Sequence, residues 1–582
     1  MASILEEVNE PKDLKELSID ELNHLAGEIR NTLIENVAMM GGHMGSNLGM
    51  VETTIAMHYV FDSPKDKFVF DVSHQSYTHK ILTGRKEGFI NKEKHHSLSG
   101  FTTPSESEHD IFKIGHTSTS VSLATGLAKA RDLKGGNENV IAVIGDGSMS
   151  GGEAFEGLNN ASVLNSNFII LFNDNEMSIA PNQGGMYSNF KELRESKGTS
   201  VNNFFKTFGL NYYYIEEGND IESLIDIFRK VKDTTKPTVI HLHTLKGKGL
   251  KWAMDNKEAG HWMMPASFDS EAMMKMPTYE KITSQFLLEK IKKDKTIAVL
   301  SAGTPGATGL TTDFREQAGN QYIDVGVAEE HAVAMISGMA RNGAKPVYEI
   351  ASSFSQRTYD QLNHDLAMNN SPATILVFGG SIGGGDCTHL GMFDMSLMSN
   401  IPNLVCLAPT TKEEYLAMLD WSIEQNSYPV IIRVPKKVVS TGKEVSFSQE
   451  NCMKAVIEKQ GNKVALLGLG NFMALAKEVS ELLASKSINA TIVNPVNYSM
   501  IDKDILHQLK ENHDLVVTLE DGLLDGGFGE KVDRYYATFN MKVLNYGAEK
   551  NYNDLVPLAE VYNMNRLNAE QIVEDILNNI RK

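Results

Sequence analysis

The sequence contains little cysteine and no long apolar segment. The three cysteines among 582 residues, Cys387, Cys406 and Cys452, are too few for a disulfide framework, so we expect a protein of the reducing cytoplasm. No run of about 20 apolar residues occurs, which argues against a membrane-spanning helix. The first residues, MASILEEVNEPKD, are acidic and lack an apolar stretch, so no secretory signal is predicted.

Basic residues are outnumbered by acidic ones, 55 against 74, which gives a net charge of −19. Because long blocks of one sign are absent, this balance argues against nucleic acid or an anionic membrane as a partner. Hydrophobic residues make up 41% and charged residues 22%, as in soluble globular enzymes. The length predicts two to four domains, each able to bury its own core.

The most informative stretch runs from Asn139 to Met177 and has the pattern of a strand, a helix and a second strand. Asn139–Gly145 is apolar and rich in β-branched residues, typical of a strand buried on both faces. It ends in the tight turn Gly145-Asp146-Gly147. Residues 150–164 have apolar side chains at helical spacing, with Ser148 or Ser150 as the predicted N-cap. Residues 167–173 predict the second strand.

The two strands of such a unit are parallel and end at the same edge of the sheet. Asp146 and Asn175 should therefore meet there. A carboxylate and an amide oxygen, with backbone carbonyls and phosphate oxygens, suit Mg²⁺. A helix N-terminus at the same place could hold a diphosphate on its free N–H groups. The alternative is an ordinary strand-to-helix turn with a stray acidic residue, and the second polar turn, Asn173-Asp174-Asn175, argues against it.

These motifs also indicate a family. GDGSMSGGEAFEGLNNA (145–161) and NDNEMSIAPN (173–182) resemble the thiamine diphosphate signature of the transketolase superfamily, and within it the 1-deoxy-D-xylulose-5-phosphate synthase family. The resemblance implies three doubly wound α/β domains with mostly parallel sheets, at residues 1–275, 279–440 and 453–582. They would be a diphosphate-binding domain, a pyrimidine-binding domain and a transketolase C-terminal-like domain. It also implies a homodimer and an active site between the first two domains of one chain.

The resemblance further implies an enzyme that transfers aldehyde or ketone groups with thiamine diphosphate and Mg²⁺. In that family pyruvate adds to the cofactor and loses CO₂, and the product carbanion attacks glyceraldehyde 3-phosphate to give 1-deoxy-D-xylulose 5-phosphate. Two alternatives stay open. One is a transketolase-like enzyme with a different donor or acceptor, and the other is a catalytically silent cofactor-binding protein. Intact Asp146, Asn175 and Glu329 argue against the silent protein.

The family match assigns site residues by position. The segment Ala328-Glu329-Glu330-His331 matches the family's AEQH motif and selects Glu329 as the acid that would protonate the cofactor's aminopyrimidine ring. Burial against that ring would raise the pKa of Glu329. The match implies that the catalytic residues are Glu329, His43, His261, His389 and Asp386. The cofactor would be bound by His74, Gly115, His116, Thr117, Gly147, Ser148, Asn175, Glu329 and Phe354. The metal ligands would be Asp146, Asn175 and Met177, and the substrate would be bound by Arg357, Arg433 and Lys436.

The departures from the family concentrate where the substrates' phosphate and polar groups are held. Ala351 replaces a tyrosine, Gly379 an arginine and Lys436 another arginine, whereas Arg357 and Arg433 remain. Arginine offers phosphate a two-pronged hydrogen-bonding fork and lysine only a point charge, so we expect a weaker preference for a phosphorylated acceptor. The chain is also shortened at residues 188–206. No charged or metal-binding cluster stands out in the third domain, so structural and oligomerisation roles are expected for it.

Overall fold

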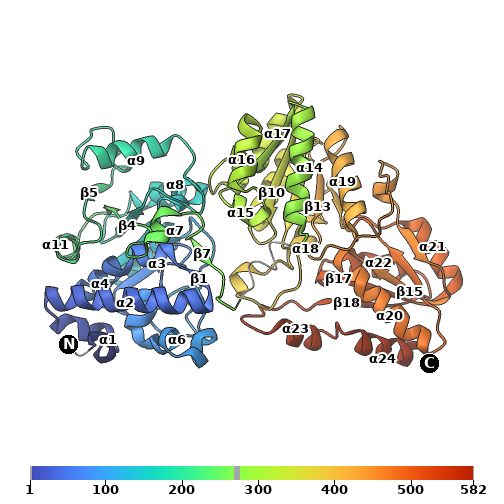
Figure 1. Cartoon of the computed structure of the whole chain (residues 1–582), viewed down its shortest axis with the longest axis horizontal. Coiled ribbons are helices and arrows are strands. Elements are labelled where there is room, and N and C mark those ends of the chain that lie inside the picture. Colours follow the sequence, from blue (N-terminus) through green and yellow to red (C-terminus); the bar gives the residue numbers. More distant parts are fainter. Residues whose placement is uncertain (1–2, 268–275, 581–582) are drawn as a thin grey trace. The chain divides into compact units, whose positions relative to one another are not determined.

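The structure is a computed structural model that describes residues 3–267 and 276–580, with only the backbone of His96. The chain forms two compact units (Figure 1): Met1–Lys275 with Gly326–Ala328, and Met276–Val325 with Glu329–Lys582. Among the described residues, the helices are all too short or too polar to cross a bilayer.

The first unit contains a five-stranded parallel sheet in the order β2-β3-β4-β6-β5. A two-stranded antiparallel sheet pairs β1 with β7. The strands are β1 (Gly42–His43), β2 (Lys67–Phe70), β3 (Val140–Gly145), β4 (Ile169–Asp174), β5 (Asn211–Ile215), β6 (Thr238–His243) and β7 (Trp262–Met263). The helices are α1 (Ile4–Glu7), η1 (Pro11–Glu16), α2 (Ile19–Met40), α3 (Gly45–Gly49), α4 (Val51–Val60), α5 (Tyr77–Lys80), η2 (Ile81–Arg85), α6 (Glu87–Ile90), η3 (Lys92–Ser97), α7 (Ser120–Lys134), η4 (Gly147–Ser150), α8 (Gly152–Ala161), α9 (Met186–Glu195), α10 (Phe204–Thr207), α11 (Ile221–Val231) and α12 (Lys251–Asp255).

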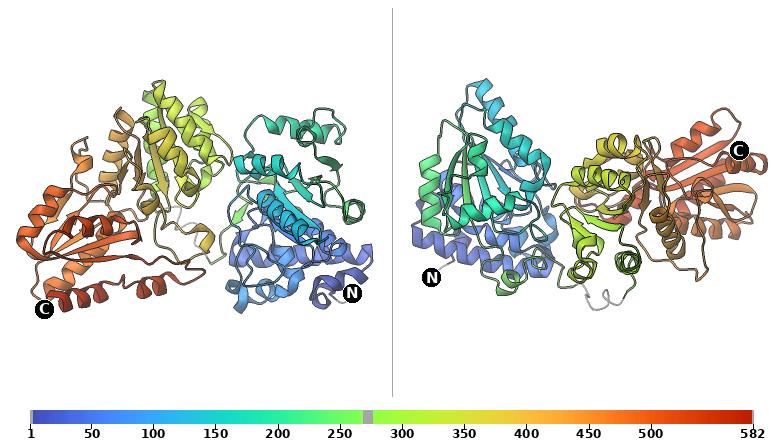
Figure 2. Two further views of the ribbon diagram at one scale, coloured as in Figure 1. Left: turned by 180° about the vertical axis from the view of Figure 1, so that it is seen from behind. Right: turned by 90° about the horizontal axis from the view of Figure 1, so that it is seen from above.

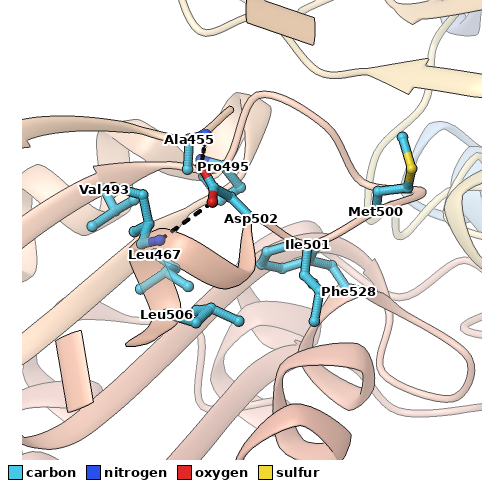
Figure 3. Close-up of a pocket in the computed structure, with 10 residues that line it drawn as sticks. Ala455, Leu467, Val493, Pro495, Met500, Ile501, Asp502, Leu506 and Phe528 are labelled. Atoms are coloured by element: carbon cyan, nitrogen blue, oxygen red, sulfur yellow. Dashed lines mark hydrogen bonds between the residues drawn. The ribbon is translucent and has the colours of Figure 1, made fainter. Parts of the chain in front are cut away.

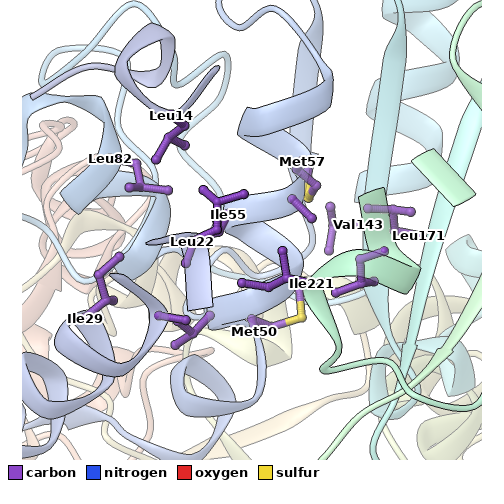
Figure 4. Packing of buried hydrophobic residues seen from close by; sticks show 14 of the residues in the cluster. Leu14, Leu22, Ile29, Met50, Ile55, Met57, Leu82, Val143, Leu171 and Ile221 are labelled. Atoms are coloured by element: carbon purple, nitrogen blue, oxygen red, sulfur yellow. The ribbon is translucent and has the colours of Figure 1, made fainter. Parts of the chain in front are cut away.

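Both faces of this sheet are buried, as expected for parallel strands rich in Val and Ile. Alternate residues of β3 and β4 belong to two different apolar clusters. Val143 and Leu171 join the layer formed with α2, α4 and α11 (Figure 4). Ile144 and Phe172 join the layer formed with α7 and α8. The blue helices and the cyan helices of the first unit therefore cover opposite faces of one sheet (Figure 2).

The second unit contains two further sheets. The first is six-stranded and parallel, in the order β12-β13-β11-β10-β8-β9. Its strands are β8 (Ile297–Ser301), β9 (Tyr322–Asp324), β10 (Lys345–Ala351), β11 (Thr374–Phe378), β12 (Val405–Leu407) and β13 (Val430–Arg433). Its helices are α14 (Tyr279–Lys293), α15 (Pro305–Thr308), α16 (Thr312–Ala318), η5 (Gly319–Gln321), α17 (Glu329–Arg341), η6 (Phe354–Thr358), η7 (Gln361–Ala367), η8 (Cys387–His389), α18 (Asp394–Met398) and α19 (Lys412–Glu424).

The other sheet has the order β14-β16-β15-β17-β18, parallel except for the antiparallel edge strand β14. Its strands are β14 (Val456–Lys459), β15 (Lys463–Gly468), β16 (Thr491–Asn494), β17 (His513–Leu523) and β18 (Lys542–Ala548). Its helices are η9 (Asn451–Met453), η10 (Gly470–Phe472), α20 (Met473–Ser485), α21 (Lys503–Asn512), α22 (Phe528–Tyr536), α23 (Leu558–Met564) and α24 (Ala569–Ile580). One apolar cluster contains residues of both sheets, such as Ile375 and Leu467, which explains why this half forms a single unit.

The predicted fold class, α/β with doubly wound and mostly parallel sheets, is confirmed. The division into three domains stays a prediction. The predicted N-cap of the helix after β3 is wrong, because Gly151 occupies that position without a side-chain hydrogen bond. A 3₁₀ turn, η4, comes first, and within it the Ser150 hydroxyl donates to the Gly147 carbonyl. The cap was misplaced because the strand continues into a 3₁₀ turn before the α-helix begins.

Strand β10 carries an acid in an apolar layer. Glu349 is 1% exposed, and its carboxyl oxygens make no hydrogen bond of good geometry to the residues described, although the nearby Thr308 side chain opposes the effect of burial on its pKa. Its strand neighbour on the same face, Val347, belongs to the apolar cluster with Tyr415 and Leu376. Burial raises the pKa of Glu349 to about 8, because the charged form is disfavoured in an apolar environment.

We predict that Glu349→Gln removes a pH dependence of stability. Between pH 4.5 and 8 the folded state keeps the proton that the unfolded state loses, so wild-type stability falls as pH rises through this window. The loss should reach roughly 3–5 kcal/mol at pH 8. Urea unfolding at pH 5.0, 6.5 and 8.0 measures it, with exposed Glu450→Gln as control. A glutamine variant with the wild-type slope would contradict the assignment.

Candidate functional site

The two polar turns at the carboxyl edge of the first sheet lie side by side, as predicted. Gly145 of β3 pairs with Asn173 of β4, and the Asp146 N–H donates to the Asn173 carbonyl at 3.0 Å. The Asp146 Oδ2 atom accepts from the Met177 N–H at 2.9 Å and from Asn182 Nδ2 at 2.7 Å. The predicted metal ligands Asp146, Asn175 and Met177 are thus drawn together, and metal binding itself stays a prediction.

The chemistry of these atoms fits a hard cation. Asn175 Oδ1 is buried and has no hydrogen-bond partner among the residues described. Asp146 is 1% exposed, and burial, helped by the nearby Asp174 carboxylate, raises the pKa of Asp146 to about 7. A buried carboxylate and an unpaired amide oxygen on adjoining turns are unfavourable by themselves and favourable around a divalent ion. The fit therefore supports Mg²⁺ at this turn.

The predicted cofactor residue Gly147 follows the same turn and faces another loop closely. A Cβ atom at this position would lie 2.5 Å from Ser178 Oγ, so any larger residue would push the loops apart. Ser148, also predicted to bind the cofactor, is buried. Its carbonyl accepts a hydrogen bond from Ser118 Oγ at 2.8 Å, which ties η4 to the loop that precedes α7.

The shortened segment after Asn182 supports the metal turn from outside. Helix α9 brings Arg194 within 2.5 Å of Asp174 Oδ2 and Tyr187 Oη within 2.9 Å of the Asp146 carbonyl. His241 Nε2 contacts the same Asp174 oxygen at 2.8 Å from the neighbouring strand. These supporting residues could not be predicted from the sequence, because the residues of α9 show no motif that links them to the turn.

Three of the predicted histidines form one cluster in the first unit. The ring of His43 lies 4.8 Å from that of His74 and 5.3 Å from that of His261, centre to centre. Antiparallel pairing of β1 with β7 places His43 opposite Trp262. His74 Nε2 contacts Ser46 Oγ at 3.0 Å. Burial, together with Lys246, His43 and His74, lowers the pKa of His261, which keeps it a neutral donor or acceptor near pH 7.

The predicted cofactor loop Gly115-His116-Thr117 ends where α7 begins. Asp71 fixes its far end, because its carboxylate accepts from the Ser118 N–H at 2.8 Å and the Ser120 N–H at 2.9 Å. The turn that leads to His74 is strained, since Val72 has a φ of +57°, a conformation that β-branched residues avoid. Backbone strain of this kind is found mostly at functional sites.

Lys246 is a buried cation that was not predicted as a site residue from the sequence. It is 2% exposed and donates from Nζ to the Ser178 carbonyl at 2.5 Å. Burial lowers the pKa of Lys246 to about 8, and the charge of Asp146 opposes that change. Lys246 begins the run Lys246-Gly247-Lys248-Gly249, and only its burial shows that this lysine, and not Lys248, faces the inside.

In the second unit the predicted residues Glu329, Phe354, Arg357 and His389 come from three segments. Glu329 begins α17 and is 3% exposed. Arg357 in η6 approaches Glu329 Oε2 to 3.6 Å, and the rings of Phe354 and His389 lie 5.7 Å apart. Burial raises the pKa of Glu329 to about 6, although Arg357 opposes this effect. The raised pKa agrees with the expectation for a general acid.

Asp386, predicted to be catalytic, caps the short 3₁₀ helix η8. Its Oδ1 atom accepts from the Thr388 N–H at 3.0 Å and from Thr388 Oγ1 at 2.7 Å. Thr388 Oγ1 in turn contacts His389 Nδ1 at 2.8 Å. The geometry therefore favours a role for Asp386 in orienting His389.

Arg433, predicted to bind substrate, makes hydrogen bonds to Asp394 and Asp521 in this structure. It is 4% exposed, its Nε donates to Asp394 Oδ2 at 2.7 Å, and one terminal nitrogen donates to the Asp521 carbonyl at 2.8 Å. A buried guanidinium that lost these partners would be an unpaired charge. In this structure Asp394 and Asp521 hold the guanidinium, which favours a structural role, and substrate binding by Arg433 stays a prediction. Gly380 packs so closely on this pair that a Cβ atom would lie 2.4 Å from Asp394 Oδ2.

The family departures Ala351, Gly379 and Lys436 gather at one sheet edge. Ala351 ends β10 and pairs with Phe378, the residue before Gly379. Lys436 follows β13, which pairs with β11, and its Nζ lies 3.4 Å from Ser381 Oγ. Gly379 has open space around it but a φ of +72°, so an arginine there would be strained.

A small hollow in the second unit has no free polar group to offer a ligand. It is lined by Leu467, Val493, Leu506, Phe528 and the helix cap Asp502 (Figure 3). The Asp502 carboxylate already accepts from the Ala455 N–H at 3.0 Å and the Ile505 N–H at 3.2 Å. This hollow is therefore a packing feature between α21 and its sheet.

Comparison with known proteins agrees with these motifs. A 1-deoxy-D-xylulose-5-phosphate synthase model matches residues 5–202 and 191–244, a transketolase pyrimidine-binding model matches 275–441, and a transketolase C-terminal model matches 453–572. The 1-deoxy-D-xylulose-5-phosphate synthase of Clostridium tetani is 36% identical over 99% of this chain and 100% of its own length. That of Dictyoglomus thermophilum is 39% identical over 90% of both chains.

Proposed function

The chain belongs to the 1-deoxy-D-xylulose-5-phosphate synthase family, and we propose that it condenses pyruvate with glyceraldehyde 3-phosphate. CO₂ is released, and 1-deoxy-D-xylulose 5-phosphate is the product. The observation that carries this proposal is the pair of turns at Asp146 and Asn175, which follow adjoining strand ends and hold a buried carboxylate and a buried amide oxygen that has no partner among the described residues. The test is to supply both substrates with thiamine diphosphate and Mg²⁺ and to follow CO₂ and product mass.

Thiamine diphosphate, when bound, supplies a nucleophilic carbon and an electron sink for the decarboxylation of pyruvate. Asp146, Asn175 and the Met177 carbonyl would hold Mg²⁺, and the metal would hold the diphosphate. Lys246 adds a buried positive charge beside this anionic site. His74, Gly147 and the loop 115–117 would complete the diphosphate and thiazolium contacts, and Phe354 would stack on the pyrimidine.

Glu329 holds a proton near pH 6 because it is buried. It would donate that proton to the cofactor's ring nitrogen as a general acid. His43 and His261 are held in one cluster, and His389 is oriented through Thr388. These three imidazoles would move protons at the carbonyl and hydroxyl oxygens of the substrates.

We predict that Lys436→Arg strengthens the preference for a phosphorylated acceptor by about tenfold. The fork of arginine adds one charge-assisted hydrogen bond of roughly 1.5–3 kcal/mol that lysine does not make. The measurement is the ratio of kcat/KM for glyceraldehyde 3-phosphate and glyceraldehyde, with Lys437→Arg at the next, exposed position as control. A wild type that already prefers the phosphate strongly, with no gain in the variant, would show that Arg357 and Lys436 suffice.

A second candidate function is two-carbon transfer to a different aldehyde. One observation favours it: the predicted phosphate site has Ala351 and Gly379 at its edge, and Arg433 makes a buried ion pair with Asp394. Screening unphosphorylated aldehydes and ketose donors against the same enzyme distinguishes the two candidates. The proposal also includes a homodimer, inferred from the family, and a cytoplasmic location, inferred from the low cysteine content.

A further inference from the structure

We propose that the C-terminal part of the chain takes part in acceptor binding, with Asp554 as a positioning residue for His389. This inference rests on the proposed function, in which His389 serves the acceptor. Two segments of the second unit carry it: the glycine loop, residues 379–391, and the clamp segment, residues 550–557, which follows β18.

The clamp segment meets the glycine loop at three consecutive residues, through the Asp554 side chain and through the backbone of Leu555 and Val556. The Leu555 N–H donates to the Gly385 carbonyl at 3.0 Å. The Asp554 Oδ1 atom accepts from the Cys387 N–H at 3.1 Å. The Val556 carbonyl lies so close to Gly384 that an added Cβ atom would be 1.9 Å from it. These contacts leave no room for a side chain at residue 384.

The other end of the glycine loop is also held by the C-terminal part of the chain. Asp521 at the end of β17 accepts from the Ile382 N–H at 2.8 Å through Oδ1. Its Oδ2 atom accepts from Asn471 Nδ2 at 2.8 Å, and Asn471 Oδ1 accepts from the Lys436 N–H at 2.9 Å. The glycine loop and Lys436 are therefore both hydrogen-bonded to the part of the chain that forms the sheet of β15 and β17.

The loop needs this support because its sequence gives it none. Gly383, Gly384 and Gly385 offer no side chains for packing, and glycine loses more conformational entropy on ordering than any other residue. Without hydrogen bonds from other segments, His389 would follow a flexible glycine loop and would have no fixed position. Asp554 fixes Cys387, the first residue of η8, and Asp386 caps the same turn through Thr388, which contacts His389. One carboxylate oxygen of Asp386, the Cys387 sulfur and one carboxylate oxygen of Asp554 all lie within 4.8 Å of one another.

Cys387 provides a reporter that does not depend on activity. It is half-buried, whereas Cys406 and Cys452 are fully buried. Burial raises the pKa of Cys406 to about 12 and that of Cys452 to about 11, so both should react slowly with iodoacetamide. Alkylation of the native full-length protein, located by peptide mass, therefore reads the opening of the glycine loop.

The test compares Asp554→Ala, Asp554→Asn and the control Asp525→Ala, whose carboxylate makes a surface pair with Lys550. We expect Asp554→Ala to raise the Cys387 alkylation rate at least fivefold and KM for glyceraldehyde 3-phosphate about tenfold. CO₂ release from pyruvate in a single turnover without acceptor should stay unchanged. Asp554→Asn keeps an oxygen acceptor for the Cys387 N–H and should restore both values. Gly384→Ala, which drives the segments apart, should behave like Asp554→Ala.

Three outcomes overturn the proposal. Unchanged alkylation in Asp554→Ala would show that the clamp segment does not order the loop. Faster alkylation with an unchanged acceptor KM would show that the loop does not serve the acceptor. If CO₂ release from pyruvate in Asp554→Ala fell as much as acceptor use, the defect would lie in the reaction of the donor and not in acceptor binding. Absence of product from the wild type would refute the proposed function instead, and the alkylation result would still decide whether Asp554 holds the loop.

Discussion

Replacing Glu329 with glutamine is expected to lower turnover by about 10²–10⁴-fold while leaving the fold and cofactor affinity nearly unchanged. The amide keeps the size of the acid and can still accept or donate a hydrogen bond, but it has no proton to deliver to the pyrimidine ring. Burial has already raised the pKa of Glu329 to about 6, so the wild-type group is protonated in part near neutral pH. Steady-state turnover and calorimetric titration of thiamine diphosphate with Mg²⁺ measure the two effects.

Exchange of the cofactor's C2 proton, followed by NMR, separates this role from substrate binding. It should slow by orders of magnitude in Glu329→Gln and stay normal in Glu330→Gln, the matched control at the next position. The less buried Glu330 shares the first turn of α17. Exchange at the wild-type rate in Glu329→Gln would mean that another residue supplies the proton.

The parts of the site that sequence could predict are those encoded locally. Buried parallel strands appear as short apolar runs, and the residue that ends each run must lie at the sheet edge. The sequence therefore predicts that the turns at Asp146 and Asn175 adjoin, and the pairing of β3 with β4 agrees with this prediction. The exact start of the following helix was less predictable, since a 3₁₀ turn and an α-helix have similar sequence patterns.

The features that the sequence could not predict depend on partners far away in the chain. Arg433 matches a substrate position by motif, yet Asp394 and Asp521 bind its guanidinium, and sequence spacing gives no sign of either contact. Glu349 lies in an apolar strand pattern that did not show whether its carboxyl group reaches solvent. The clamp segment shows no chemical motif, because its contacts with the glycine loop are mostly made by the backbone.

Removing the metal ligands should abolish tight cofactor binding. We expect Asp146→Ala and Asn175→Ala each to raise the Kd for thiamine diphosphate, measured by calorimetry with Mg²⁺, by about 100-fold. The estimate corresponds to roughly 3 kcal/mol, as for the loss of one charged contact. Asp146 also accepts two hydrogen bonds that shape the turn, so thermal unfolding without cofactor is measured in parallel. Asn175 Oδ1 has no such partner among the described residues, so Asn175→Ala should leave apoprotein stability nearly unchanged.

Glu176→Gln is the matched control, because this exposed acid sits between Asn175 and Met177 in the same turn and pairs with Arg194 and His243 instead. Its Kd for the cofactor should stay within about threefold of wild type, since exposed ion pairs contribute little. Mg²⁺ dependence gives the sharper contrast: wild type should bind thiamine diphosphate tightly only with the ion, whereas Asp146→Ala should bind it equally weakly with and without. Tight, Mg²⁺-dependent binding in both ligand variants would place the metal away from this turn, and the buried carboxylate would then need another explanation.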